Sequence, residues 1–257
     1  MRRVSKRVSP WFLVLLAVTV GGGALTVIGT PEALISGGSV LLTAGVVLLV
    51  LGGWAVSLCL HEFGHAAVAY RGGDLSVRDK GYLTLDIRRY TDVGLSFVLP
   101  IVFLLLGGIP LPGGAVWINH GAIRSRAMRS LVSFAGPATN IVIGALLTAA
   151  VALVPMPIGL AIGLSCLALI QVLAFVLNIL PVPGLDGFGV LEPYLSLPAR
   201  QLAARVRPWA PIVLFLLIIG VPGVSQLFFE IGGAIYSAVG GDFNLAAQGY
   251  SQLLFWR

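Results

Sequence analysis

The chain has 257 residues, of which 58% are hydrophobic and only 10% are charged, and its mean hydropathy is +0.99. Soluble domains carry about 25% charged residues, so this composition excludes an ordinary soluble enzyme and predicts an all-α polytopic membrane protein. At roughly 20 apolar residues per span, the length holds about five or six transmembrane helices. That leaves no room for a folded domain outside the membrane, and we expect residues 1–257 to form a single transmembrane domain.

The net charge of +6 reflects membrane topology rather than nucleic-acid binding. Fifteen of the sixteen Lys and Arg residues fall in four clusters, at residues 2–7, 71–89, 124–129 and 200–207. Such clusters mark cytoplasmic segments, and basic residues interleaved with aromatics on a solvated face are absent. The excess of Arg over Lys is typical of a GC-rich prokaryotic genome. We therefore expect an integral protein of a prokaryotic plasma membrane, with its N-terminus toward the cytoplasm, the lipid bilayer as its surroundings and no nucleic-acid partner.

The first half of the chain predicts two spans. The first runs over residues 11–28 and is peripheral to the core, and residues 31–38 are expected to turn outside. The second span, residues 41–70, returns to the cytoplasmic side. After it, "YLTLDI" (82–87) alternates apolar and polar residues, which predicts a short strand.

The segment that follows the second span predicts a re-entrant element. The unbroken apolar part of residues 95–119 is short for a span, and a single crossing would place the basic residues at 124–129 outside. We therefore expect an excursion that returns to the cytoplasmic side, with "GGAVWIN" (113–119) as an edge strand. Non-helical backbone at that depth must be buried in protein or line a wet cavity.

The rest of the chain predicts two spans and a broken apolar region. The third span runs over residues 131–154 and the fourth over residues 158–180, and the fourth ends in "NILPVPGLDGFG" (178–189). Two prolines and three glycines cannot continue a helix, so the chain is expected to unwind there. The apolar region 209–239 is interrupted at Pro222, which makes it one bent span or two short ones, peripheral to a core of about residues 41–194.

The second span carries the residues of a metal site. Its sequence "VSLCLHEFGHAAVAY" (56–70) places His61, Glu62 and His65 in an otherwise apolar helix. His61 and His65 are four residues apart, so they share one helical face and can bind one metal ion, while Glu62 can accept a proton from a water on that metal. A short motif can arise by chance, but ionisable groups in a membrane cost about 2.5 kcal/mol or more each and are functional by default. The pattern predicts one Zn²⁺ ion with an open coordination position.

Asp186 is the best candidate for a third ligand. It ends the broken fourth span at the same depth as His65, and unwinding of the chain would direct its carboxylate inward. Glu192 is the nearest competitor, although it also suits an interfacial position. The Asp residues between positions 74 and 92 lie near Arg and Lys and are expected to form solvated pairs, and Glu230 has no motif around it.

Three motifs together resemble the site-2 protease family of intramembrane zinc metalloproteases. They are "HEFGH" (61–65), "GPATN" (136–140) and "NILPVPGLDG" (178–187), and the spacing of the last matches the family pattern N-x-x-P-x-x-x-x-D-G. The resemblance covers about residues 41–194 and is to the compact prokaryotic branch without a PDZ or CBS domain.

The resemblance implies roles for individual residues. His61, His65 and Asp186 would be zinc ligands, and Glu62 would be the general base. Asn178 would donate a hydrogen bond to the oxyanion; the alternative is that it caps carbonyls where the helix breaks. Gly136, Pro137 and Asn140 are expected to serve close helix packing and a break at the start of the third span.

The leading hypothesis is intramembrane proteolysis, in which zinc-activated water hydrolyses a peptide bond within or near a transmembrane segment of a substrate, close to the cytoplasmic face. The alternative is a divalent-metal transporter or a non-catalytic metal-binding membrane scaffold, and a protease-like protein without activity is a third possibility. No internal repeat is visible, and no polar residues continue a path toward the outer face, which disfavours transport. The sequence gives no indication of the substrate's identity or of an oligomeric state.

Overall fold

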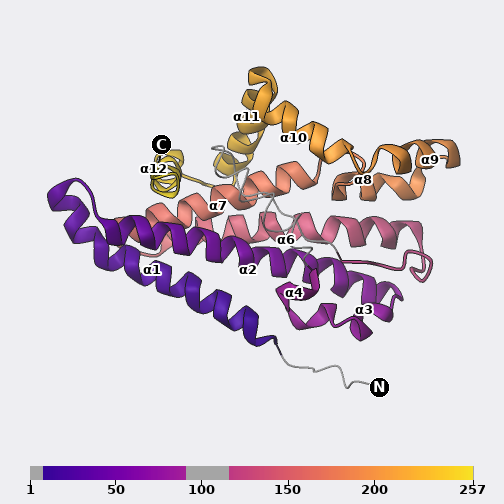
Figure 1. Cartoon of the computed structure of the whole chain (residues 1–257), viewed down its shortest axis with the longest axis horizontal. Helices are drawn as coiled ribbons and strands as arrows, with labels where there is room; N and C mark the ends of the chain where they lie inside the picture. Colours follow the sequence, from indigo (N-terminus) through magenta and orange to yellow (C-terminus); the bar gives the residue numbers. More distant parts are fainter. Residues whose placement is uncertain (1–7, 91–115, 257) are drawn as a thin grey trace.

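The computed structural model describes residues 8–90 and 116–256, and every regular element in these two ranges is a helix (Figure 1). The four long helices are α1 (Pro10–Ser36), α2 (Val40–Gly72), α6 (Arg126–Leu153) and α7 (Ile158–Asn178). The shorter ones are α3 (Ser76–Asp79), the 3₁₀ turn Tyr82–Thr84, α4 (Ile87–Tyr90), α8 (Asp186–Leu191), the 3₁₀ turn Glu192–Tyr194, α9 (Leu197–Val206), α10 (Ala210–Gly220), α11 (Pro222–Ala238) and α12 (Phe243–Leu253). The predicted all-α fold is confirmed.

The long helices correspond to the four spans that the sequence predicts most clearly. Each is long and apolar enough to cross a membrane, and a fifth span is counted if α9 and α10, which bend by 61° relative to each other, are taken together. The described ranges therefore contain four or five candidate spans, and the upper figure agrees with the lower end of the expected five to six. The apolar region after residue 209 forms two separate helices, α10 and α11, divided at Val221.

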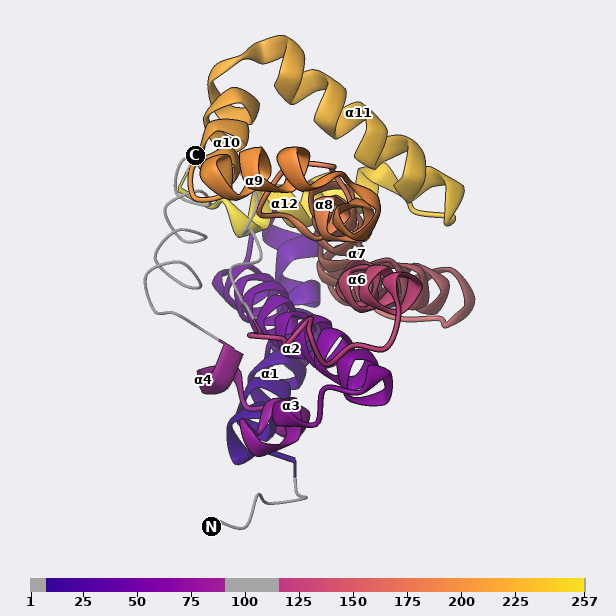
Figure 2. The same cartoon turned by 90° about the vertical axis from the view of Figure 1, so that its right-hand side faces the viewer.

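Helix α7 lies inside the bundle. In the most apolar stretch of α7, 78% of the residues are buried, whereas the figure for the most apolar stretches of α1 and α6 is 28%. Helix α7 packs against α2, α6, α11 and α12. Figures 1 and 2 show α1, α2, α6 and α7 as neighbouring rods, with α10 and α11 on the side of α7 away from α1. Helices α1 and α6 expose apolar side chains outward, as helices in contact with lipid do.

Two proline-based predictions are wrong. Residues 31–36 do not form a turn, because α1 continues through Pro31 to Ser36 and ends at Gly37. Pro137 does not break the third span, because α6 begins at Arg126 and continues through it. Membrane helices tolerate proline where Ser and Thr side chains and neighbouring helices satisfy the freed backbone groups, so neither residue is a reliable stop signal here.

The short strand expected at residues 82–87 is also wrong. The segment forms a 3₁₀ turn, then Leu85 adopts a left-handed conformation with φ 56°. The Asp86 carboxylate accepts a hydrogen bond from the Arg88 backbone N–H at 3.2 Å, which favours a turn. Six alternating residues cannot specify a strand when the described ranges contain no second strand to pair with.

Most of the predicted re-entrant excursion at 95–119 lies outside the described residues. Of the predicted edge strand 113–119, only residues 116–119 are described, and these have no regular secondary structure.

One end of the bundle gathers three of the basic clusters. The Arg124 backbone N–H donates to the Gly72 carbonyl at 3.1 Å, which joins the end of α2 to the start of α6. The Ser130 hydroxyl donates to the Val190 carbonyl at 2.7 Å, which joins α6 to α8. Helices α3, α4, α8 and α9 lie at this same end in Figure 1.

Candidate metal centre and active site

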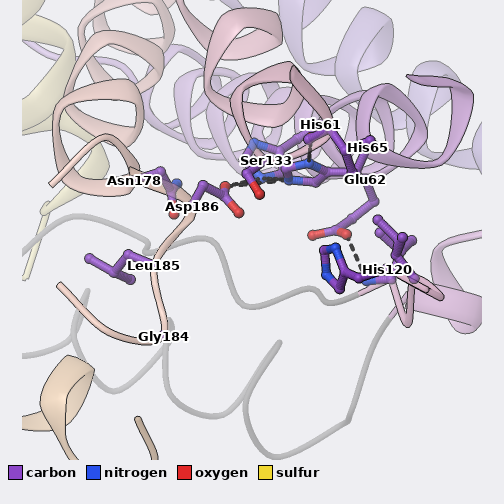
Figure 3. Close-up of a pocket in the computed structure, with 12 residues that line it drawn as sticks. His61, Glu62, His65, His120, Ser133, Asn178, Gly184, Leu185 and Asp186 are labelled. Atoms are coloured by element: carbon purple, nitrogen blue, oxygen red, sulfur yellow. Dashed lines mark hydrogen bonds and ion pairs between the residues drawn. The ribbon is translucent and has the colours of Figure 1, made fainter. Parts of the chain in front are cut away.

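The two histidines of α2 and Asp186 of α8 converge on one point. His61 Nε2 lies 3.2 Å and His65 Nε2 lies 3.3 Å from the same Asp186 oxygen, Oδ2. The two Nε2 atoms are 3.1 Å apart. Figure 3 shows the three side chains pointing toward one another across the space between the two helices.

These separations are those of ligands on one zinc ion. Nitrogen and oxygen atoms bound to tetrahedral zinc at about 2.0–2.2 Å lie about 3.3–3.5 Å from one another. The observed separations of 3.1–3.3 Å are close to that range. Both imidazoles are almost fully buried, and with Asp186 they would supply three ligands to such an ion.

The outer nitrogens of the histidines have acceptors that direct the inner nitrogens toward a metal. His61 Nδ1 lies 2.6 Å from Asn140 Oδ1, and His65 Nδ1 lies 2.6 Å from the Val132 carbonyl oxygen. Because carbonyl oxygens only accept, and the Asn140 amide nitrogen donates to Gln171 Oε1 at 3.1 Å, each Nδ1 carries the proton. Each Nε2 then has a free lone pair, as a metal ligand must.

Gly136 of α6 leaves the space in which the imidazoles meet. A Cβ atom at this position would lie 2.3 Å from His65 Nε2 and 2.5 Å from His61 Nε2. Such distances are well inside van der Waals contact, so any larger residue would displace the ligands. The donor set, its spacing and this close backbone approach together fit zinc.

The break after α7 places Asp186. Helix α7 ends at Asn178, and the chain is non-helical until Asp186 begins α8, as the sequence predicts. A Cβ atom on Gly187 would lie 2.0 Å from the Ile179 carbonyl oxygen. The glycine after the aspartate therefore allows α8 to start directly against the end of α7.

Glu62 lies beside the ligands and faces the same cavity, with 2% of its surface exposed (Figure 3). Its Oε2 accepts a hydrogen bond from the Val116 backbone N–H at 3.0 Å. Three residues on, the Asn119 backbone N–H donates to Asp74 Oδ2 at 2.7 Å. Hydrogen bonds to Glu62 and Asp74 thus hold residues 116–119 at both ends. Asp74 is buried, so the solvated pair expected for it is not formed.

The cavity at the ligands has a volume of about 240 Å³. Its lining includes Asn178, whose amide nitrogen donates at 3.0 Å to the Ala174 carbonyl, one turn back in α7. In Figure 3 Asn178 lies next to Asp186. Glu192, the competing third ligand, pairs instead with Arg207 at 2.8 Å.

Sequence reasoning missed three contributors to this site. Asn140 and Gln171 form the hydrogen-bond chain behind His61, and His120 lines the cavity. Gly136 and Asn140 are four residues apart on one helical face, and a polar side chain within an apolar span is a functional candidate by default. That signal was present in the sequence for Asn140 and Gln171.

Comparison with known proteins finds close relatives over the whole chain. A protein of Mycobacterium tuberculosis (strain H37Rv) named "Putative zinc metalloprotease Rip2" is 44% identical over 259 residues, covering 99% of this chain and 96% of that protein. A protein of the same name from Mycolicibacterium smegmatis is 40% identical, with 99% and 96% covered. "Putative zinc metalloprotease YwhC" of Bacillus subtilis is 28% identical over 178 residues, covering 64% of this chain and 77% of that protein. No family model and no solved structure matches the chain.

Proposed function

Because the chain belongs to the site-2 protease family of zinc metalloproteases, we propose that it is a bacterial membrane endopeptidase that cleaves a peptide bond within or near a transmembrane segment of a membrane protein. The observation that carries this proposal is the convergence of His61, His65 and Asp186 beside the buried carboxylate of Glu62. The names of the relatives do not favour the transporter alternative.

The three ligands would hold one zinc ion and leave one position open. Zinc there supplies a Lewis acid that lowers the pKa of a water molecule to near 7. Asn140 and the Val132 carbonyl keep both imidazoles in the required tautomer, so neither ring has to reorient when the metal binds.

Glu62 is proposed as the general base. It follows His61 directly on α2, so its carboxylate borders the same cavity as the ligands. From that position it accepts the proton of the attacking water and delivers it to the leaving amine of the scissile bond. The hydrogen bond from Val116 fixes the carboxylate and still leaves its second oxygen for this transfer.

Asn178 is proposed to donate to the oxyanion that forms on the scissile carbonyl. Its amide lines the cavity next to Asp186, but it donates to the Ala174 carbonyl in this structure. The second proton of the amide is the one available to a substrate, so the bond to Ala174 and the catalytic role are compatible.

Residues 116–119 are proposed to hold the substrate in an extended form. A helical substrate hides its scissile bond, so the peptide must unwind before it reaches Glu62, and an irregular segment fastened beside the cavity can pair with it by strand addition. The active site would face the cytoplasm, because basic clusters gather at this end of the bundle.

The test is cleavage of a model substrate with one transmembrane segment by the purified protein, wild type against Glu62→Gln. The expected result is loss of cleavage with unchanged zinc content, since Glu62 is not a ligand. Glu230→Gln is the matched control. Glu230 is exposed, accepts a hydrogen bond from Gln226 and does not line the metal cavity. Equal cleavage by the wild type and Glu62→Gln would refute the proposal.

A further inference from the structure

A second cavity of about 220 Å³ adjoins the metal site and has a different chemistry. It is lined by Arg129 of α6, by Arg200 and Arg207 on and just after α9, by Glu192, and by His120, which also lines the metal cavity. A volume of about 220 Å³ is large enough for a phosphate group.

The lining carries more positive than negative charge. Arg207 pairs with the Glu192 carboxylate at 2.8 Å. Arg200 donates to the carbonyls of Pro193 and Leu195 at 2.8 and 3.0 Å, contacts that hold the side chain without neutralising it. Three guanidinium groups against one carboxylate leave two excess positive charges.

Arg129 is the group that most requires a ligand. Its Nε is buried and has no hydrogen-bond partner among the described residues. A buried unpartnered donor is costly, and one on a guanidinium group more so. Guanidinium groups bind phosphate oxygens in a bidentate geometry, and Arg129 lines this cavity, so its guanidinium group can pair with a phosphate bound there.

His120 does not supply the positive charge. Burial lowers its pKa below the ordinary value of 6.5; Glu192 opposes this effect, and Arg129 and Arg207 add to it. The imidazole is thus neutral at neutral pH, and selection for an anion depends on the arginines.

Helix α9 indicates where the anion comes from. Ala203 is buried, and Arg200 and Arg207, three residues before it and four after it, lie on its face of the helix, whereas Leu202 points away from Arg200 and is 62% exposed. Trp209, just beyond the helix, is 68% exposed. Arg205, three residues after Leu202, is exposed on the same side, and a short helix that exposes both Arg and large apolar side chains is typical of the boundary between lipid headgroups and acyl chains.

We propose that this second cavity binds the headgroup of an anionic phospholipid. The exposed Leu202 and Trp209 side chains set the depth of α9 in the membrane, which places Arg200 and Arg207 at the level of the lipid phosphates. Basic pockets beside transmembrane helices bind such headgroups in other membrane proteins. The cavity also borders α8 at Gly189, three residues after Asp186, so a bound headgroup contacts the helix that carries the third zinc ligand (Figure 2 shows α8 and α9 together at this end).

The experiment titrates the detergent-purified full chain with dihexanoyl phosphatidylglycerol and follows its thermal unfolding temperature. A ligand of the folded state raises this temperature in a saturable way. The wild type is expected to show that rise, and Arg129→Gln and Arg200→Gln to need at least tenfold more lipid for it. Arg205→Gln is the matched control, because Arg205 is an exposed residue of the same helix outside the cavity and should respond like the wild type. Arg129→Lys, which keeps the charge but not the bidentate geometry, should fall between.

Three outcomes would overturn the proposal. The first is an equal response of the wild type and both Gln variants, provided that circular dichroism shows the variants folded; if Arg129→Gln does not fold, Arg200→Gln and Arg129→Lys decide. The second is that inorganic phosphate at the same concentration reproduces the rise, which would assign the cavity to a free anion. The third is that an acidic peptide produces the arginine-dependent rise and the lipid does not, which would assign it to a protein ligand.

Discussion

Replacing Gly136 by alanine tests whether the histidines meet at a metal. The new Cβ would lie 2.3 Å from His65 Nε2, 2.5 Å from His61 Nε2 and 2.6 Å from His61 Cε1. Ordinary contact between such atoms begins near 3.5 Å, so the rings must withdraw by about 1 Å. The backbone of α6 cannot yield instead without disturbing its packing against α2 and α7.

A displacement of that size is large on the scale of metal coordination. Ligand distances in a working site vary by about 0.2 Å, so a shift of about 1 Å removes at least one histidine from the zinc. Loss of a partner behind a ligand already costs about 10- to 100-fold in metal affinity. For Gly136→Ala we expect a loss of at least about 100-fold, which corresponds to about 2.7 kcal/mol.

The assay is zinc affinity measured by competition with a chelator, with the zinc content of the purified protein as a second readout. Gly21→Ala is the matched control, because Gly21 is also in a membrane helix and a Cβ there meets nothing within 4 Å. The control should bind zinc like the wild type. Wild-type affinity in Gly136→Ala would refute the placement of the ligands around this glycine.

Three further substitutions test the surroundings of the metal. Asn140→Leu should lower zinc affinity about 10- to 100-fold, and Asn140→Asp, which keeps an acceptor for His61, should restore most of it; equal losses in both would exclude this hydrogen bond as the cause. Gly187→Ala, whose Cβ would lie 2.0 Å from a carbonyl oxygen, should lower both zinc content and thermal stability, and a normal zinc content would contradict the proposed fit of α8. Burial raises the pKa of Asp74, but hydrogen bonds from Ser76 and Asn119 outweigh it and hold the pKa below 3.8. The stabilisation from Asp74 is therefore nearly complete above about pH 5 and is lost as the pH falls through its lower folded-state pKa. Asp74→Asn should remove this part of the acid dependence of unfolding, and an unchanged pH profile would contradict it.

The parts of the site that sequence could predict are those fixed within one element. The spacing of His61 and His65 is a property of a single helix, and the Pro- and Gly-rich break before Asp186 is a local signal that a helix must end. To pair Asp186 with the two histidines, the prediction needed only that all three lie at the same membrane depth. A chain with so few charged residues leaves few other acids to consider.

The parts that sequence could not predict depend on how helices pack. The bond from His61 to Asn140 joins residues 79 positions apart and depends on the register between α2 and α6. The sequence favoured a packing role for Asn140, since "GPATN" contains small residues that suit close helix contact. In the structure the motif does both: the close approach of α6 to α2 at Gly136 brings Asn140 within hydrogen-bond distance of the His61 ring.

Asp74 shows how a surface-like sequence context can conceal a structural acid. It follows the glycines that end α2 and stands near Arg and Lys, which predicts a solvated pair, but it is 1% exposed. Its carboxylate accepts the backbone N–H groups of Ser76 and Asn119, so it connects the end of α2 to residues 116–119. Those residues in turn donate to Glu62 through Val116. A carboxylate twelve residues beyond the proposed general base therefore fixes the segment that orients this base, and the same segment is where we expect the substrate to bind.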